Sequence, residues 1–168
     1  MKQLKPKYIG LITGVVMIVA LLIAFYELHI PFRSKFQWVV FTIYLAGVIW
    51  SLLLFHQKGQ SDKKLKDYFS EGFKTFIVAV LIIVVYTFIF VKMNPQTLDS
   101  FIEENNKELT AQGNRTQTEI MENAMKIRSS YPFVMAMGVM VIYLVIGALV
   151  SLAGAAFLSQ KNRSAAIS

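Results

Sequence analysis

Residues 75–91 read Thr-Phe-Ile-Val-Ala-Val-Leu-Ile-Ile-Val-Val-Tyr-Thr-Phe-Ile-Phe-Val. Thirteen of these seventeen residues are Leu, Ile, Val or Phe, and no residue of the stretch is charged. Each such side chain favours the centre of a bilayer by about 0.3 to 0.6 kcal/mol, so the whole stretch favours insertion by roughly 4 to 8 kcal/mol. It is therefore predicted to cross a membrane as a helix.

Three other stretches of the chain share this character. Residues 8–26, 36–57 and 129–160 contain no Asp, Glu, Lys or Arg. A membrane span needs about 20 predominantly apolar residues, with a range of about 17 to 25, and every stretch reaches this length. Because Pro132 is tolerated in the first turn of a helix, the last helix is predicted to start near Ser130 and to end near Leu158.

The predicted fold class is all-α, an integral membrane four-helix bundle that forms a single membrane domain over residues 1–168. Of the 168 residues, 55% are hydrophobic and 16% are charged, whereas soluble domains are about 25% charged. A soluble single domain and a disordered chain are thereby excluded. The chain has no cysteine, which also excludes disulfides, thiolate metal sites and thiol catalysis. The predicted spans cover residues 8–28, 36–57, 73–92 and 131–158.

The distribution of basic residues predicts how the chain crosses the membrane. Segments 1–7, 58–74 and 161–168 hold ten Lys and Arg in 32 positions, whereas segments 27–35 and 92–128 hold seven in 46 positions. Cytoplasmic loops are enriched in Lys and Arg, so the first set is predicted to be cytoplasmic, with both termini inside. The net charge of +7 then lies entirely on the inner side, where it acts as an orientation and lipid-surface signal.

The inner segment 63–74 has an amphipathic pattern that leads into the third span. Leu65, Tyr68, Phe69 and Phe73 follow one another at helical spacing, while the lysines lie mostly on other faces. Two interpretations are open: an anchor that fixes topology, which we favour, and binding of anionic lipid head groups. The predicted lipid-interface residues are Lys63, Lys64, Lys66, Tyr68, Phe69, Phe73 and Lys74.

The outer segment 94–129 is predicted to be a hairpin of two amphipathic helices. Asn94 and Pro95 have the composition of an N-cap and a first helical turn, Gly113 ends the first helix, and Thr116 to Glu119 has the form of a capping box. The apolar stripes of the two helices can pack against each other, which we favour, or they can receive a partner. The candidate partner-binding residues are Leu98, Phe101, Ile102, Leu109, Ile120, Met121 and Met125.

Small residues in the first and last spans indicate close helix contacts. In lipid, such residues allow helix backbones to approach each other, as in the GxxxG pair of Gly10 and Gly14. The open interpretations are packing within the bundle, which we favour, and dimerisation or docking to another membrane protein. The predicted helix-packing residues are Gly10, Gly14, Gly147, Ser151, Gly154 and Ala155.

Chemistry at membrane depth normally requires ionisable side chains there, and the four uncharged stretches contain no Asp, Glu, Lys or Arg. His56 and His29 are predicted on opposite sides of the membrane, and Glu27 with His29 supplies only two metal ligands. No phosphate-binding loop or Ser-His-Asp set is present. We therefore expect no enzyme, no catalytic residue, no cofactor, no metal site and no nucleic-acid partner.

Three short motifs, taken together, resemble one bacterial family. They are Lys7-Tyr8-x-Gly10-Leu11-x-x-Gly14, Asp67-Tyr68-Phe69-Ser70-Glu71-Gly72-Phe73-Lys74 and Gly147-Ala148-Leu149-Val150-Ser151-Leu152. In order and spacing they are similar to the four-span membrane protein family known as domain of unknown function 4199, over almost the whole chain. The resemblance implies a small bacterial integral membrane protein, and it supplies no activity, cofactor or catalytic residue.

Three functional hypotheses follow from these features. The first is a non-enzymatic accessory or scaffold subunit of the bacterial cytoplasmic (inner) membrane, which binds membrane lipids and either itself or another membrane protein. The alternative is a small oligomeric transporter or channel component, although uncharged spans fit poorly with ion or proton coupling. A lipid-modifying enzyme that uses loop residues such as Glu27 ranks last.

Overall fold

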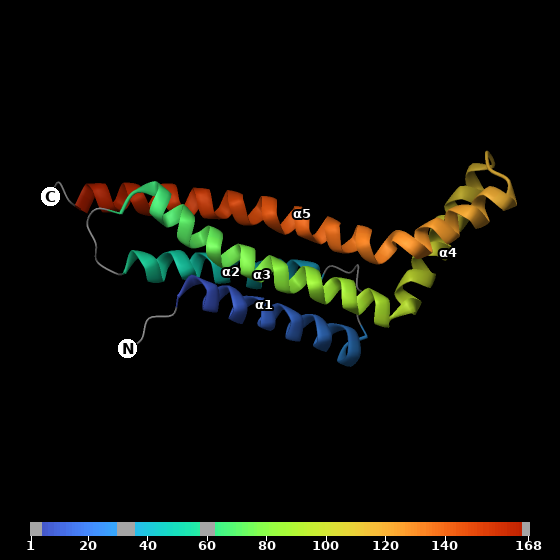
Figure 1. The fold of residues 1–168 in the computed structure, drawn as a ribbon, viewed down its shortest axis with the longest axis horizontal. Helices are drawn as coiled ribbons and strands as arrows, with labels where there is room; N and C mark the ends of the chain where they lie inside the picture. Colours follow the sequence, from blue (N-terminus) through green and yellow to red (C-terminus); the bar gives the residue numbers. More distant parts are fainter. Residues whose placement is uncertain (1–4, 30–35, 58–62, 166–168) are drawn as a thin grey trace. The chain divides into compact units, whose positions relative to one another are not determined.

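The computed structural model describes residues 5–29, 36–57 and 63–165, and all regular structure in these residues is helical (Figure 1). The five α-helices are α1 (Pro6–Leu22), α2 (Gln37–His56), α3 (Leu65–Met93), α4 (Pro95–Gln112) and α5 (Gln117–Ala165). A π-helical turn, η1 (Ile23–Glu27), continues α1. The predicted all-α class is confirmed for these residues.

Four helical stretches are long and apolar enough to cross a membrane. They are Pro6–Glu27, Gln37–His56, Leu65–Met93 and Gln117–Lys161. Large apolar side chains are exposed along them, as for Val141, Val145 and Leu149, which follow one another at intervals of four residues on α5. A helix that is apolar on its exposed face as well as its buried face is typical of a membrane span.

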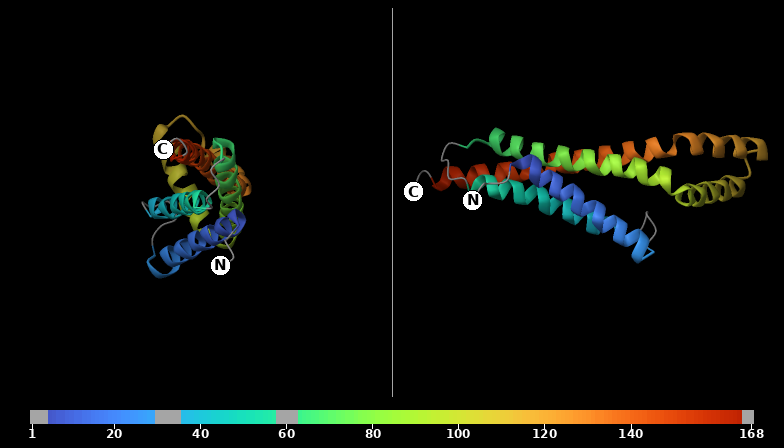
Figure 2. Two further views of the ribbon diagram at one scale, coloured as in Figure 1. Left: turned by 90° about the vertical axis from the view of Figure 1, so that its left-hand side faces the viewer. Right: turned by 60° about the horizontal axis from the view of Figure 1, so that its bottom comes forward.

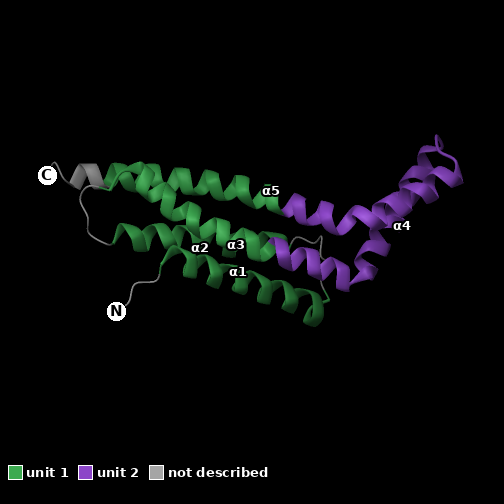
Figure 3. Cartoon of the chain, in the orientation of Figure 1, with its two compact units in different colours: residues 1–83, 140–168 green, residues 84–139 purple. Residues whose placement is uncertain are grey.

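The described residues form two compact units (Figure 3). Unit 1 comprises residues 1–83 and 140–168, and unit 2 comprises residues 84–139. Helices α3 and α5 contribute residues to both units.

In unit 1, α1 packs against both α2 and α3. The Thr13 side chain of α1 occupies the space beside Gly47 of α2, and the Thr75 carbonyl of α3 lies against Gly10 of α1. Helix α5 contacts the same two helices, α2 through Tyr44 and α3 through Gly72. The left view of Figure 2 shows the four segments of unit 1 in the order α1, α2, α5, α3 around a common centre.

The start of α1, the end of α2, the start of α3 and the end of α5 meet at one end of unit 1, named here the basic end. The contacts concerned join Pro6 to Thr75, Lys63 to Phe55, and Leu158 to Leu52 and Tyr68. Consecutive spans of unit 1 therefore run in alternating directions. Among the described residues, the predicted inner segments contribute these lysines to the basic end: Lys5, Lys7, Lys63, Lys64, Lys66, Lys74 and Lys161. Lys2, Lys58 and the side chain of Arg163 lie outside the described residues.

In unit 2, α4 and the first turns of α5 bury a common apolar seam. Leu98 and Ile102 of α4 are buried, as are Ile120 and Tyr131 of α5. The Phe101 and Tyr131 rings are in contact, with centroids 4.9 Å apart. The seam packs the two segments against each other as a helical hairpin.

Polar contacts tie the same two segments together at several points along their length. Asn123 Nδ2 donates a hydrogen bond to Asn105 Oδ1 at 3.0 Å. Closer to the open end of the hairpin, Arg128 pairs with Asp99 at 2.5 Å, although both side chains are more than half exposed. An exposed pair of this kind adds at most about 1 kcal/mol, so the apolar seam supplies most of the packing energy.

The caps at the ends of α4 are those that the local sequence predicts, with one exception. Gly113 caps α4 in the left-handed conformation, with φ of 66°, and Thr116 and Glu119 form the reciprocal bonds of a capping box that starts α5. Pro95 occupies the first helical turn, as predicted. However, Asn94 Nδ2 donates back to the Phe90 carbonyl at 2.9 Å instead of the side chain capping the α4 amides.

The prediction that a separate helix starts near Ser130 is wrong, because α5 is continuous from Gln117 and passes through Pro132. Proline removes one amide hydrogen bond but does not by itself end a helix that is held by its neighbours. Here Tyr131 is buried against Phe101, and the Ser130 hydroxyl donates to the Lys126 carbonyl at 2.8 Å. The second helix of the hairpin and the last span are therefore one element.

Gly113 provides a test of the hairpin turn. A side chain there meets no atom within 4 Å, so Gly113→Ala introduces only backbone strain, which costs about 1 to 2 kcal/mol in the left-handed region. The matched control is Gly138→Ala in α5, which is equally unobstructed but helical and should not destabilise. Amide hydrogen exchange of α4 in the full-length protein should become faster in the first variant only. Equal exchange in both variants would contradict the proposed role of Gly113.

Candidate functional site

The predicted helix-packing residues lie at contacts between helices of unit 1. Gly10 faces the Thr75 carbonyl and Gly14 faces Ile82, so α1 approaches α3 along both glycines. A Cβ atom on Gly10 would overlap that carbonyl. The two glycines are therefore needed for the observed distance between α1 and α3.

On α5, the small residues face α2 and α3. Gly154 lies against the Leu52 side chain, and Ala155 belongs to a buried cluster with Leu52, Tyr68 and Leu158. Because these residues are small, the bulky side chains of the facing helices fill the space between them. Close packing of this kind is a main source of attraction between helices in lipid.

A buried hydroxyl in unit 1 links three helices. Thr75 of α3 is 0% exposed, and its Oγ1 lies 2.6 Å from Ser51 Oγ of α2. The same atom is 3.1 Å from the Glu71 carbonyl and 3.3 Å from the Pro6 carbonyl at the start of α1. Since a hydroxyl can donate one bond and accept others, Thr75 can donate to a carbonyl while it accepts from Ser51.

A second polar contact joins α2 to α5. The Tyr44 hydroxyl donates to the Tyr143 carbonyl at 2.7 Å, and the Tyr143 ring stacks on Phe41 with centroids 4.7 Å apart. Gly147, one turn beyond Tyr143, leaves room for the Tyr44 hydroxyl, which a Cβ at this position would overlap. The glycine therefore gives the tyrosine access to the backbone of α5.

Two contact glycines were missed in the sequence. Gly47 accommodates Thr13, and Gly72 accommodates Ser151, whose buried Oγ has no hydrogen-bond partner. Gly47 stands in the middle of an uncharged stretch, which is a usable signal for close helix approach. Gly72 follows the polar residues Ser70 and Glu71, so its sequence context does not indicate a helix contact. Only the packed structure identifies it as a contact residue.

At the basic end, two predicted lipid-interface residues lie in the interior instead. Tyr68 is 0% exposed, and its hydroxyl is 2.8 Å from His56 Nδ1. Lys63 is 8% exposed and donates to the Phe55 carbonyl at 2.5 Å, with its ammonium 4.7 Å from the centre of the Phe55 ring. A cation is favourable at the carbonyl end of a helix, so Lys63 acts as a cap for α2.

The other predicted lipid-interface residues remain at the surface of unit 1. Lys64, Lys66, Lys74 and Phe73 are exposed, and Phe69 is half-buried. The amphipathic stripe is thus divided: its Tyr68 side packs into the unit, and its Phe73 side stays outside. These surface residues still carry the prediction of a lipid interface.

The candidate partner-binding residues of the hairpin are also divided. Leu98, Ile102 and Ile120 are buried in the seam, while Phe101 and Leu109 are half-buried. Met121 and Met125 are 70% and 60% exposed. The seam on α5 follows Ile120, Ile127 and Tyr131 at helical spacing, so both methionines are turned out of it.

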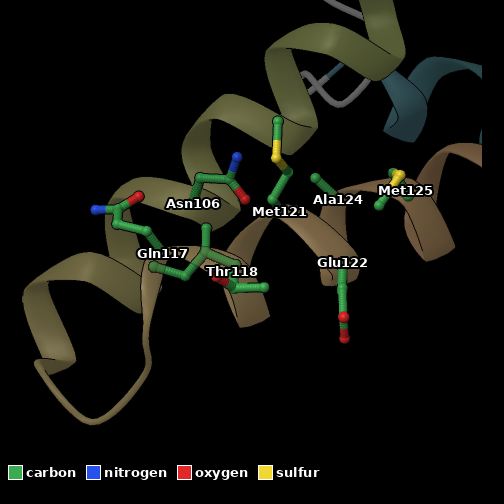
Figure 4. Close-up of a pocket in the computed structure, with 8 residues that line it drawn as sticks. Asn106, Gln117, Thr118, Met121, Glu122, Ala124 and Met125 are labelled. Atoms are coloured by element: carbon green, nitrogen blue, oxygen red, sulfur yellow. The ribbon is translucent and has the colours of Figure 1, made fainter.

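An open groove of about 630 Å³ runs beside these methionines (Figure 4). Asn106 lines it from α4, and its Oδ1 is buried without a hydrogen-bond partner. The α5 residues that line the groove are Gln117, Thr118, Ile120, Met121, Glu122, Ala124 and Met125. The groove therefore places two exposed thioethers beside polar side chains of α4 and α5.

The exposed faces of α4 are charged. Lys107 pairs with Glu103 at 2.7 Å, and this hydrogen bond holds the pKa of Glu103 below its usual value. Within the described part of the chain, no three His, Asp or Glu side chains are grouped closely enough to hold a metal ion. His29 Nδ1 lies 3.2 Å from the Glu27 carbonyl.

The chain matches a known protein family over most of its length. A family model described as "Protein of unknown function (DUF4199)" matches residues 8–160 of the chain. No curated protein and no solved structure matches the chain.

The Thr75 contact can be tested with two isosteric substitutions. Thr75→Val keeps the volume but removes the hydroxyl that joins three helices, so we expect a loss of about 0.6 to 1.7 kcal/mol of unfolding free energy in detergent. Thr42→Val is the matched control, because the exposed Thr42 hydroxyl bonds only to the Trp38 carbonyl of its own helix. Titration with SDS measures the unfolding free energy of both variants. An equal loss of unfolding free energy in the two variants would refute the special role of Thr75.

Proposed function

This chain belongs to the DUF4199 family of proteins of unknown function, and we propose that it acts as a non-enzymatic accessory or scaffold subunit that binds another protein of a bacterial inner membrane. In this proposal unit 1 is an integral membrane four-helix bundle with both termini in the cytoplasm. The amphipathic hairpin of unit 2 then lies on the outer side of the membrane.

The arrangement of charges supports this orientation. The four helix ends at the basic end of unit 1 bring together lysines from segments that are distant in sequence. Clustered lysines favour the cytoplasmic face. Helix α3 leaves this end at Leu65 and has 29 residues, or about 43 Å at 1.5 Å per residue, which exceeds the hydrocarbon thickness of about 30 Å. As a span, it delivers Asn94 and the hairpin to the opposite side.

The exposed methionines beside the hairpin groove are the observation that best supports the proposed binding of a partner protein. Leu98, Ile102 and Ile120 close the hairpin core without help from Met121 and Met125. Methionines are adaptable and are common on surfaces that bind other proteins. The polar side chains of Gln117, Thr118 and Glu122 also line the groove, which favours an ordered partner segment over a lipid tail.

The placement of charged residues supports a non-enzymatic role. All charged side chains of the sequence lie outside the four uncharged stretches, so these stretches have no Asp, Glu, Lys or Arg that could take part in proton transfer. The polar groups in unit 1, such as Thr75 and Tyr44, bond to other helices. These features favour a structural role for the membrane part.

Orientation can be measured with single cysteines, because the chain has none of its own. Lys64→Cys and Asn114→Cys place thiols at exposed positions at the start of α3 and beyond the end of α4. A membrane-impermeant maleimide added to intact cells should label position 114 and not position 64, whereas lysed cells should label both. Labelling of both positions in intact cells, or of position 64 alone, would overturn the orientation.

The partner site can be tested by photocrosslinking in native membranes. A p-benzoylphenylalanine residue at position 121 should give one discrete adduct, and the additional substitution Met125→Asp should strongly reduce it because an unpaired carboxylate resists burial. The control position is Glu104, which is exposed on α4 and does not line the groove. Equal crosslinking at both positions would refute a specific site. An adduct at twice the 19.0 kDa mass of the chain would identify a second copy instead of another protein.

A further inference from the structure

A second groove lies in unit 1, on the surface between α3 and α5. It has a volume of about 390 Å³ and is lined by Leu65, Phe69, Ala148, Leu149 and Leu152, together with Lys66. Leu65, Leu149 and Leu152 are all exposed along it. The groove is thus apolar along its length and has one cationic side chain in its lining.

The packing of α3 on α5 explains why the groove exists at this position. Ser151 lies against Gly72, so the two helices approach closely at this contact. Phe69 and Leu65 stand one and two turns nearer the start of α3, and Ala148 on α5 is the smallest side chain of the lining. A short side chain among larger ones leaves a surface depression instead of a flat surface.

The groove lies at the basic end of unit 1, at the start of α3. Lys64 and Lys66 are exposed there. The nearest acidic group of the same turn, Asp67, accepts a hydrogen bond from the Lys64 amide at 2.9 Å and so is held at the helix start. The first turn of a helix also carries a partial positive charge. The surroundings of Lys66 therefore attract an anion.

We propose that this groove is a binding site for an anionic phospholipid, with an acyl chain on Leu65, Phe69, Ala148, Leu149 and Leu152 and the phosphate on the Lys66 ammonium. The apolar lining fits a hydrocarbon chain, and the lysine fits the head group of the same molecule. The site depends on the membrane insertion and orientation proposed above, but it does not depend on the partner of the hairpin.

A second copy of the chain fits the groove less well. Two copies inserted in the same orientation present the same basic end to each other, so a copy on this groove would bring its own lysines towards Lys64 and Lys66. Like charges at such a contact repel, whereas an anionic lipid gains about 1 kcal/mol for each nearby lysine. The positive charge of the site therefore favours an anionic lipid over a second copy of the chain.

The test uses the full-length protein in nanodiscs of phosphatidylcholine that contain a minor fraction of phosphatidylglycerol. Lipids retained by the protein are counted by native mass spectrometry, and phosphatidylglycerol with a diazirine in its acyl chain maps the site. Crosslinks should fall on residues 65–69 and 148–152. Lys66→Gln should reduce the preference for phosphatidylglycerol about fivefold, which corresponds to about 1 kcal/mol.

Two further variants control for surface charge and for shape. Lys161→Gln removes the same charge from an exposed lysine of the basic end that does not line the groove, and it should leave the preference unchanged. Ala148→Phe fills the groove and should abolish the crosslinks. Because Lys66 is exposed, its variant should keep the helicity of the wild type, so its result does not depend on the fold of the Ala148 variant.

Three results would overturn the lipid site: equal retention of both lipids, an equal effect of Lys161→Gln and Lys66→Gln, or crosslinks from this groove to a second copy. The hairpin proposal fails separately. A phosphatidylglycerol preference without a hairpin adduct would support the lipid site and refute the scaffold partner. A hairpin adduct without a phosphatidylglycerol preference would support the scaffold partner and refute the lipid site.

Discussion

The hydrogen bond between Thr75 and Ser51 is the contact on which the arrangement of unit 1 depends. In lipid, apolar side chains gain nothing by leaving the solvent for a protein interior, so helices associate through close packing and interhelical hydrogen bonds. At 2.6 Å this bond joins α2 to α3, and the Pro6 carbonyl brings the start of α1 to the same hydroxyl. The hydrogen bond from the Tyr44 hydroxyl to the Tyr143 carbonyl joins α2 to α5 in the same way.

Small residues make these hydrogen bonds possible. Gly10 lets α1 approach the Thr75 carbonyl, and Gly147 lets the Tyr44 hydroxyl reach the backbone of α5. Each polar contact therefore lies beside a residue whose missing side chain allows the short distance. At the basic end, Lys63 caps α2 within unit 1, whereas Lys64 and Lys66 are exposed.

The hairpin of unit 2 has the pattern of an amphipathic helix pair. The hairpin closes on a seam of Leu98, Ile102 and Ile120, is terminated by a left-handed glycine, and carries charged pairs on its outer face. The seam is complete without Met121 and Met125, which are both exposed. The protein thus has two open grooves: one beside the methionines of the hairpin and one, mostly apolar, beside Lys66 in unit 1.

By itself, the sequence determined the helical class, the four apolar stretches, Pro95, Gly113 and the capping box at Thr116, because these depend on composition and on contacts a few residues apart. Only the tertiary structure decided that α5 continues through Pro132, that Tyr68 and Lys63 turn inward, and that Gly47 and Gly72 are contact residues. The fate of each of these residues depends on a neighbour from another helix: Phe101 for Tyr131 beside the proline, His56 for Tyr68, Phe55 for Lys63, and Ser151 for Gly72. Periodicity along one helix shows which residues share a face, but the face that becomes buried is set by which helix packs against it.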